Sequence, residues 1–290
     1  DHCVTEFIRV TDKLLPDHIF YKYCPELHTE GKTLAGTPCF IQLLGGQPSP
    51  MAENAHKAFE LGAPGIDLNF GCPAKTVNRH DGGATLLKNP ERLYQIISAI
   101  KNVVPPDYPV TAKVRLGFAD KTLVKEIAQA VSDANAHRLT VHARTKMEGY
   151  RPPAHWEFIR HMTEVSRIPV VANGDIWSVE EYKKCIEISG CQDVALGRSL
   201  IATPDLALQI KNYVLKTQYQ PLKWKEVTER FLPLFFQKSL EFRSEKYAVA
   251  RAKQYLKMLS PGYSEAKELF ETFKRISTSH EAYQLFLKTA

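Results

Sequence analysis

The sequence lacks the features that mark membrane proteins and proteins of oxidising compartments. No apolar run approaches the roughly 20 residues that a membrane helix needs. Residues 1–10 mix Asp1, Glu6 and Arg9 into an apolar stretch, so we expect no signal peptide. The six cysteines include no C-x-x-C pair, which predicts neither a structural zinc site nor a disulfide framework. We therefore expect a cytoplasmic protein without a bound metal.

Most of the chain also lacks an excess of charge of either sign. The first 221 residues hold 25 Lys+Arg against 24 Asp+Glu, whereas residues 222–290 hold 13 against 8. A basic segment of this kind is typical of a surface that binds a polyanion such as nucleic acid. A helical domain with a solvated basic face would leave the same pattern.

Short β-like runs alternate with helical stretches up to about residue 215. One helical stretch begins at Asn89-Pro90, which predicts an N-cap followed by the first helical residue. Such alternation predicts an α/β fold with a parallel sheet, and its length suits a TIM (β/α)8-type barrel of roughly 250 residues. The expected strands are 3–10, 38–45, 65–72, 109–117, 139–145, 169–176 and 193–199.

Seven strands are one fewer than a closed barrel needs. Because the chain opens directly on a strand, we expect that one βα unit is missing from its N-terminus, with a gap between strands 3–10 and 193–199. After residue 221 the pattern is helical only, in segments 223–240, 244–259, 264–276 and 279–289. We expect a barrel domain over residues 1–215 and an all-helical bundle over residues 222–290.

Polar residues occupy the inward-facing positions of several expected strands. Side chains alternate between the two faces of a strand, and the apolar set must pack under the helices. The inward set is Asp67, Asn69, Thr111, Lys113, Arg115, Thr140, His142, Arg144, Asn173 and Asp175. Lys113, Arg115, His142 and Arg144 lie in the later halves of their strands, where barrel enzymes place their active sites. Internal ion pairs with the two aspartates are the structural alternative, although two carboxylates cannot neutralise four such groups.

Two loops and one cysteine complete the predicted site. The loops after the last two strands carry Asn173-Gly174-Asp175 and Gly197-Arg198, which are suited to a phosphate because glycine lets backbone N–H groups approach it. Cys72 follows a strand end in a glycine-rich loop that also holds Lys75. Its position favours a chemical role, as nucleophile or acid, over the packing role of most lone cysteines.

Five segments together resemble the tRNA-dihydrouridine synthase family over essentially the whole chain. They are LNFGCPAKTVNRHDGGATLL (68–87), KVRLG (113–117), VHART (141–145), ANGDI (172–176) and GRSLI (197–201). TEFIRV (5–10) and VARAKQYL (249–256) are most similar to the type that reduces uridine 16 of the tRNA D-loop. The family's first strand and its Pro-Met-x-Gly-type loop have no counterpart here, so we expect a barrel strand and part of the FMN site to be absent from this chain.

The resemblance implies a flavin-binding barrel, a helical tRNA-binding domain, FMN as cofactor, NADPH as electron donor and tRNA as partner. FMN would contact Gln42, Lys113, His142, Asn173, Gly174, Asp175, Gly197 and Arg198. The reduced flavin would deliver a hydride to uracil C6, and Cys72 would protonate C5 as general acid. The substrate would be held by Asn69, Lys75, Arg115, Arg144, Lys246, Arg251, Lys253 and Lys257.

The spacing of basic residues in the expected helix 244–259 supports part of this predicted substrate-binding set. Lys246, Lys253 and Lys257 fall on one face of the expected helix 244–259, whereas Arg251 is added by the resemblance alone. Two other functions remain open: a flavin dehydrogenase of a free pyrimidine, and a non-catalytic RNA-binding protein. Comparing the turnover of tRNA with that of free uridine distinguishes a pyrimidine dehydrogenase from a tRNA-modifying enzyme. A flavin absorption spectrum distinguishes a flavin enzyme from a non-catalytic RNA-binding protein.

Overall fold

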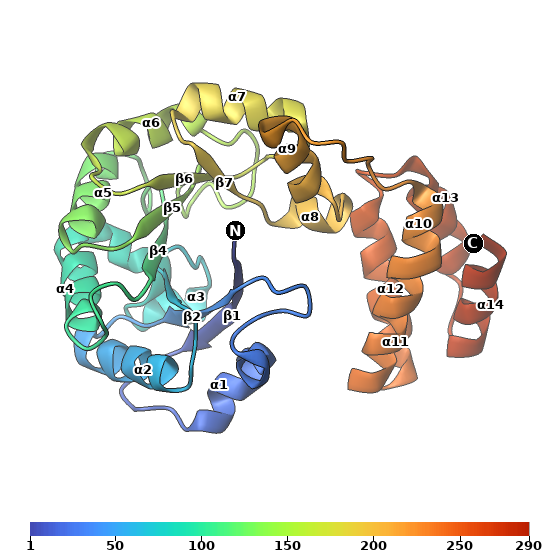
Figure 1. Cartoon of the computed structure of the whole chain (residues 1–290), viewed down its shortest axis with the longest axis horizontal. Coiled ribbons are helices and arrows are strands. Elements are labelled where there is room, and N and C mark those ends of the chain that lie inside the picture. Colours follow the sequence, from blue (N-terminus) through green and yellow to red (C-terminus); the bar gives the residue numbers. More distant parts are fainter. Residues whose placement is uncertain (290) are drawn as a thin grey trace. The chain divides into compact units, whose positions relative to one another are not determined.

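The computed structural model describes residues 1–289. All seven expected strands are present, and they form one parallel sheet in chain order that curls as part of a barrel (Figure 1). The strands are β1 Cys3–Arg9, β2 Cys39–Leu44, β3 Ile66–Asn69, β4 Val110–Arg115, β5 Arg138–His142, β6 Val170–Asn173 and β7 Asp193–Ala195. Each lies within the run predicted for it, except that β5 begins one residue earlier. The predicted α/β barrel-type fold is therefore confirmed.

Helices follow the strands in the βα order that the sequence predicts. They are α1 Asp17–Tyr23, α2 Pro48–Glu60, α3 Lys75–Arg79, α4 Pro90–Lys101, α5 Val124–Asp133, α6 Trp156–Val165 and α7 Val179–Ser189, with 3₁₀ turns η1 Pro25–Thr29 and η2 Gly83–Lys88. Figure 1 shows α2, α4, α5 and α6 on the outside of the curved sheet. Helix α4 begins at Pro90 with Asn89 at the N-cap position, as predicted, although the Asn89 side chain makes no capping hydrogen bond.

The alternation of side chains explains which face of the sheet meets these helices. In β4, Val110, Ala112 and Val114 are fully buried on the helix side. The neighbouring positions carry the polar set, and the register pairs Asn69 with Lys113 across β3 and β4. The same register places polar side chains of adjacent strands beside one another at the carboxyl edge of the sheet.

The sheet is open in the part of the chain that the structure describes. β1 pairs only with β2 and β7 pairs only with β6, so these two strands are its edges. This order confirms the predicted gap between the first and last strands. The outer side of β1 and the outer side of β7 have no strand partner among residues 1–289.

The chain forms two compact units. The first comprises Asp1–Asp175 and Lys183–Ala195, and the second comprises Ile176–Tyr182 and the residues from Leu196 onward. The predicted domain limits, 1–215 and 222–290, stay a prediction. Among residues 1–289, no helix combines the length and the apolar character needed to cross a membrane.

The second unit is helical from Arg198 onward in its described residues. Its helices are α8 Arg198–Ala202, α9 Leu206–Leu215, α10 Trp224–Glu226, the π-helix η3 Val227–Phe231, α11 Leu232–Phe242, α12 Glu245–Leu259, α13 Ser264–Phe273 and α14 Ser279–Thr289. The π-turn directly precedes Leu232-Pro233, where proline removes a backbone donor and disturbs regular helix. Phe236, Leu256 and Phe273 are completely buried in the core of this bundle.

Candidate active site

A hydrogen-bonded network joins the inward faces of β2, β3 and β4. Gln42 Nε2 donates to Asp67 Oδ2 at 2.7 Å, and Thr111 Oγ1 donates to Asp67 Oδ1 at 2.6 Å. Asn69 Nδ2 in turn donates to Gln42 Oε1 at 2.8 Å. Burial raises the pKa of the Asp67 carboxyl, against the lowering effect of these hydrogen bonds. The chain of amides fixes the orientation of Asn69 at the carboxyl end of β3.

Lys113 connects strands that do not pair with each other. Its Nζ, on β4, donates to Asn173 Oδ1 on β6 at 3.2 Å, and Asn173 Nδ2 donates to the Ala195 carbonyl oxygen at 2.8 Å. Burial lowers the pKa of Lys113 to about 8, while nearby Asp67 raises it. The predicted inward direction of Lys113 and Asn173 is confirmed by this contact. An amine with so low a pKa, on the inner face of a barrel, is typical of a functional site.

Arg115 anchors the loop that carries Cys72. Its side chain is 3% exposed, and Nε donates to the Gly71 carbonyl oxygen at 2.8 Å. Nη1 donates to the carbonyl oxygens of Thr145 at 3.2 Å and Gly149 at 3.0 Å, in the loop after β5. Burial lowers the pKa of Arg115. Three carbonyl groups from two loops therefore depend on one guanidinium for their hydrogen bonds.

The backbone around Cys72 is held closely on its other side. Its carbonyl oxygen accepts from Ala84 N at 3.0 Å and from Asn78 Nδ2 at 2.8 Å. Gly83 has a φ of 60°, and an added Cβ there would lie 2.8 Å from the same oxygen. Cys72 itself is 8% exposed and packs against Leu44 and Val77. The loop thus presents one small nucleophilic side chain from a rigid backbone at a strand end.

Arg144 and Asp175 form an ion pair on the same edge of the sheet. Arg144 is completely buried; its Nε donates to the Arg151 carbonyl oxygen at 2.6 Å, and its Nη1 lies 3.4 Å from His142 Nε2. The internal ion-pair alternative therefore holds for this arginine. Its predicted contact with substrate, like that of Arg115, stays a prediction, because both guanidinium groups are engaged with the protein.

Tyr150 is a neighbour of the site that the sequence did not reveal. Its ring centroid lies 5.8 Å from that of His142 and 5.3 Å from Arg115 Cζ, although 56% of the residue is exposed. An exposed aromatic ring beside two site residues can stack on a flat ligand. The available signal was its place in the Gly149-Tyr150-Arg151 segment after β5, at the end of the barrel where sites form.

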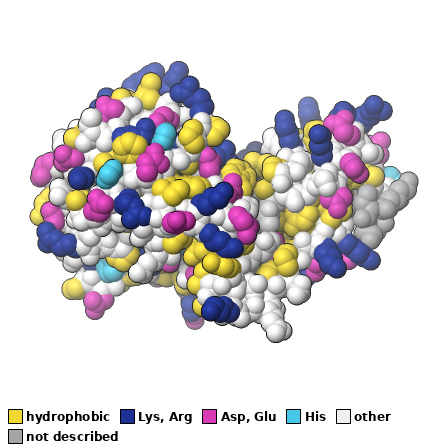
Figure 2. Space-filling model, turned by 90° about the horizontal axis from the view of Figure 1, so that it is seen from above, with side chains coloured by type: hydrophobic (Ala, Val, Ile, Leu, Met, Phe, Trp, Pro, Cys, Tyr) yellow, Lys and Arg dark blue, Asp and Glu magenta, His cyan; other side chains and the backbone are white. Residues whose placement is uncertain are grey.

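The remaining predicted residues lie outside these networks. Lys75 is exposed at the start of α3. Gly197 and Arg198 belong to the second unit, where Arg198 Cζ lies 5.5 Å from the Trp177 ring, and their predicted contact with FMN stays a prediction. Lys246, Arg251 and Lys257 are exposed on α12, and Lys253 is half-buried there. On the face drawn in Figure 2, basic and acidic side chains are interspersed, which favours local contacts over one uniform basic field.

A separate group of possible metal ligands lies in the first unit. The ligand atoms of Cys24, Glu26 and Cys39 are all within 4.8 Å of one another. Burial raises the pKa of both thiols, and that of Cys39 reaches about 12. Both cysteines are buried, as is typical of cysteines that fill a packed core.

Comparison with known proteins connects this geometry to one family. A profile described as dihydrouridine synthase (Dus) matches residues 1–290. The chain belongs to the dihydrouridine synthase family. It is 50% identical over 275 residues to the tRNA-dihydrouridine(16) synthase of Pseudomonas syringae pv. tomato, covering 95% of this chain and 86% of that protein. It is 44% identical over 282 residues to the protein of the same name from Haemophilus influenzae, covering 97% and 89%.

Solved structures with similar folds are more distant in sequence. The old yellow enzyme from Trypanosoma cruzi matches with a TM-score of 0.50 and 12% identity, over 77% of this chain and 81% of that one. The histamine dehydrogenase from Rhizobium sp. 4-9 matches with a TM-score of 0.52 and 16% identity, over 67% and 38%. At such identities the likeness concerns the fold alone, and it agrees with the barrel-type architecture of the first unit.

Proposed function

We propose that this dihydrouridine synthase reduces uridine 16 of the tRNA D-loop to 5,6-dihydrouridine, with FMN as cofactor, NADPH as electron donor and Cys72 as proton donor. The observation that carries the proposal is the sequence identity of 44–50% to the two relatives above, whose names give that position. The rigid Cys72 loop beside the Lys113 network supports it, because the reaction needs an acid next to a site for a planar ligand. A tRNA substrate is in keeping with a cytoplasmic location.

The inner face of the first unit carries donors that suit a flavin. Gln42, Lys113, His142 and Asn173 converge there with one amine, two amides and an imidazole, which suit the carbonyl and nitrogen edges of the ring. Gly174 has a φ of +121°, and a Cβ there would lie only 3.0 Å from His142 Cδ2. Glycine therefore lets the backbone lie close to the His142 ring, next to Asp175, which is the last of the predicted cofactor residues in this unit. When bound, FMN would supply the hydride that it receives from NADPH.

The side chains of the chain itself would orient the base and move the proton. Protonated Lys113 would stabilise negative charge on the ligand that it contacts. Asn69, held by Gln42 and Gly71 N, offers a fixed amide to the uracil edge. Cys72 would donate its proton to C5 of the ring, and Arg115 would keep the Cys72 loop in place. The target base must leave its stack before these groups can reach it.

A pair of tRNA transcripts that differ only at position 16 tests the proposal. We expect NADPH oxidation and dihydrouridine formation, detected by a mass increase of the modified nucleoside, with uridine at that position. A transcript with cytidine there should give no dihydrouridine and only the NADPH oxidation that occurs without tRNA. Equal turnover of the two transcripts would reject position 16, and turnover of free uridine in place of tRNA would indicate a pyrimidine dehydrogenase.

A further inference from the structure

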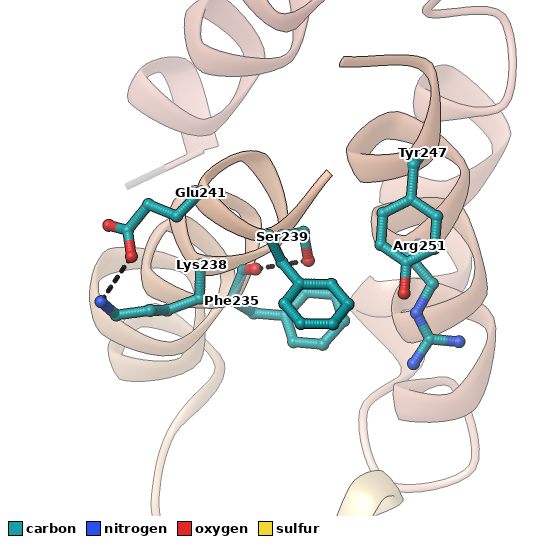
Figure 3. A pocket seen from close by; sticks show the side chains of 7 residues that line it. Phe235, Lys238, Ser239, Glu241, Tyr247 and Arg251 are labelled. Atoms are coloured by element: carbon teal, nitrogen blue, oxygen red, sulfur yellow. Dashed lines mark hydrogen bonds and ion pairs between the residues drawn. The ribbon is translucent and has the colours of Figure 1, made fainter. Parts of the chain in front are cut away.

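Helices α11 and α12 form a hairpin with an open groove at its turn. Only Arg243 and Ser244 join the two helices, and Ser244 caps α12 by accepting from Tyr247 N. The groove has a volume of about 460 Å³ and is lined by Phe235, Lys238, Ser239, Glu241, Phe242, Tyr247 and Arg251. Figure 3 shows Phe235 and Ser239 on α11 facing Tyr247 and Arg251 on α12. The whole groove lies within the second unit, on two helices with extensive mutual packing.

The groove presents flat aromatic surfaces to solvent. Phe242, at the end of α11, is 74% exposed, which leaves a large apolar ring largely unburied. Arg243 Cζ lies 5.7 Å from the Phe242 ring centroid and 5.8 Å from that of Tyr247, so the guanidinium is a third planar group at the same place. On the inner side, the Phe235 ring lies 4.4 Å from that of Tyr255. Exposed aromatic groups that gather in this way are typical of a binding surface.

The charges of the groove favour an anion. Lys238 is paired with Glu241. Arg251 donates to the neutral Gln254 Oε1 at 2.6 Å, and Arg243 contacts aromatic rings. Among the described residues, neither arginine takes part in an ion pair, so two guanidinium groups keep their charge for a ligand. Glu245, two residues after Arg243, accepts hydrogen bonds from Ser279 N and Oγ.

We propose that this groove binds an unstacked nucleotide of the RNA, with its base on Phe242 and its phosphate at Arg251 and Arg243. The inference rests on the proposed function, because it takes tRNA as the substrate. Proteins read single-stranded parts of RNA by stacking bases on aromatic and guanidinium planes and by pairing Arg with phosphate. A docked apolar helix of another protein would need a longer apolar groove and would leave both arginines without a partner.

Four variants of the full chain test the groove by tRNA affinity at several salt concentrations. Phe242→Ala should weaken tRNA binding by about 5- to 100-fold without changing its salt dependence, because stacking carries no charge. Phe242→Trp should restore it. Arg251→Ala should reduce the slope of log K against log salt by about 0.7–0.9, the loss of one phosphate contact. Leu234→Ala is the matched control: Leu234 is 55% exposed on the same helix and does not line the groove.

A fully paired RNA duplex serves as the second probe, because it offers phosphates without unstacked bases. Phe242→Ala should bind this duplex as the wild-type protein does. The proposal is overturned if Phe242→Ala binds tRNA as tightly as Leu234→Ala does, or if it loses the same factor with the duplex. The proposed function is judged separately, by dihydrouridine formation in the wild-type protein. A wild type that binds tRNA through Phe242 but forms no dihydrouridine would reject the reaction and leave the groove in place.

Discussion

We expect the depressed pKa of Lys113 to make binding of the proposed FMN cofactor depend on pH. Burial lowers this pKa from 10.5 to about 8, so the amine titrates within a range that the folded protein can be studied in. At pH 7 about nine in ten of these side chains carry a charge, and at pH 9 about one in ten. A ligand that binds only the protonated Lys113 amine therefore binds more weakly as the pH rises, because the amine must first take up a proton. We expect the Kd for FMN to increase by about tenfold per pH unit above pH 8.

The sign of the linkage separates this effect from loss of the fold. Below pH 8 the folded and the unfolded chain both hold the Lys113 proton, and the cost of burying the charge is fully present. Between pH 8 and 10.5 the unfolded chain binds more protons than the folded one at this site, so its contribution to stability rises with pH. Weaker FMN binding at pH 9 thus cannot result from destabilisation at Lys113.

Titration of the apoprotein with FMN, followed by flavin fluorescence from pH 7 to 9.5, measures the effect. Lys113→Met should bind FMN weakly with an affinity that no longer changes with pH. Lys125→Met, an exposed lysine on α5, should keep the wild-type profile. A wild-type Kd that is constant from pH 7 to 9.5 would refute the assignment of Lys113 to the flavin.

Three further perturbations address the acid, its support and the RNA surface. Cys72→Ala should slow dihydrouridine formation by about 10²–10⁴-fold while NADPH still reduces the flavin at the wild-type rate; stopped-flow absorbance decides, and wild-type tRNA turnover would remove Cys72 from the mechanism. Arg115→Lys cannot satisfy the carbonyl groups of Gly71, Thr145 and Gly149 together, so the free energy of unfolding in urea should fall by about 1.5–3 kcal/mol; an unchanged denaturation midpoint would contradict this anchoring role. Replacing Lys253 and Lys257 by Ala should raise the KM for tRNA and lower the salt slope of binding by about 1.4–1.8, with NADPH oxidation in the absence of tRNA unchanged; a wild-type slope would show that this face only solvates the helix.

Local pattern was enough to predict most of the first unit. The strand alternation placed Lys113 and Asn173 on the inner face, and the contact between their side chains confirms it. The open edge between β1 and β7 also followed from counting strands. By contrast, Asn89 has the residue type and position of an N-cap, yet its side chain makes no such bond. Propensity names the candidates for a local hydrogen bond, and the surrounding packing decides whether the bond forms.

The candidate site, too, could be predicted from the sequence only in part. Segment 68–87 identified the Cys72 loop without any structure, because its residues resemble those of one family. That Arg115 secures this loop to the one after β5 could not be read from spacing, since Gly71 and Gly149 are far apart in sequence. Tyr150 was overlooked for the same reason. Its place in the site depends on contacts with the His142 ring and the Arg115 guanidinium, which come together only when the strands lie side by side.

By itself the sequence determined the order of strands, the face on which each polar side chain lies and the family, since period and motif are properties of a single stretch of chain. Only the tertiary structure decided which of these side chains form hydrogen bonds or ion pairs within the protein and which remain available to a ligand. It pairs Arg144 with Asp175 and lowers the pKa of Lys113 by burial. In the hairpin of α11 and α12 it leaves Phe242 uncovered beside an unneutralised Arg251. The physical reason is that desolvation and pairing depend on neighbours brought together from distant parts of the chain, which no local pattern contains.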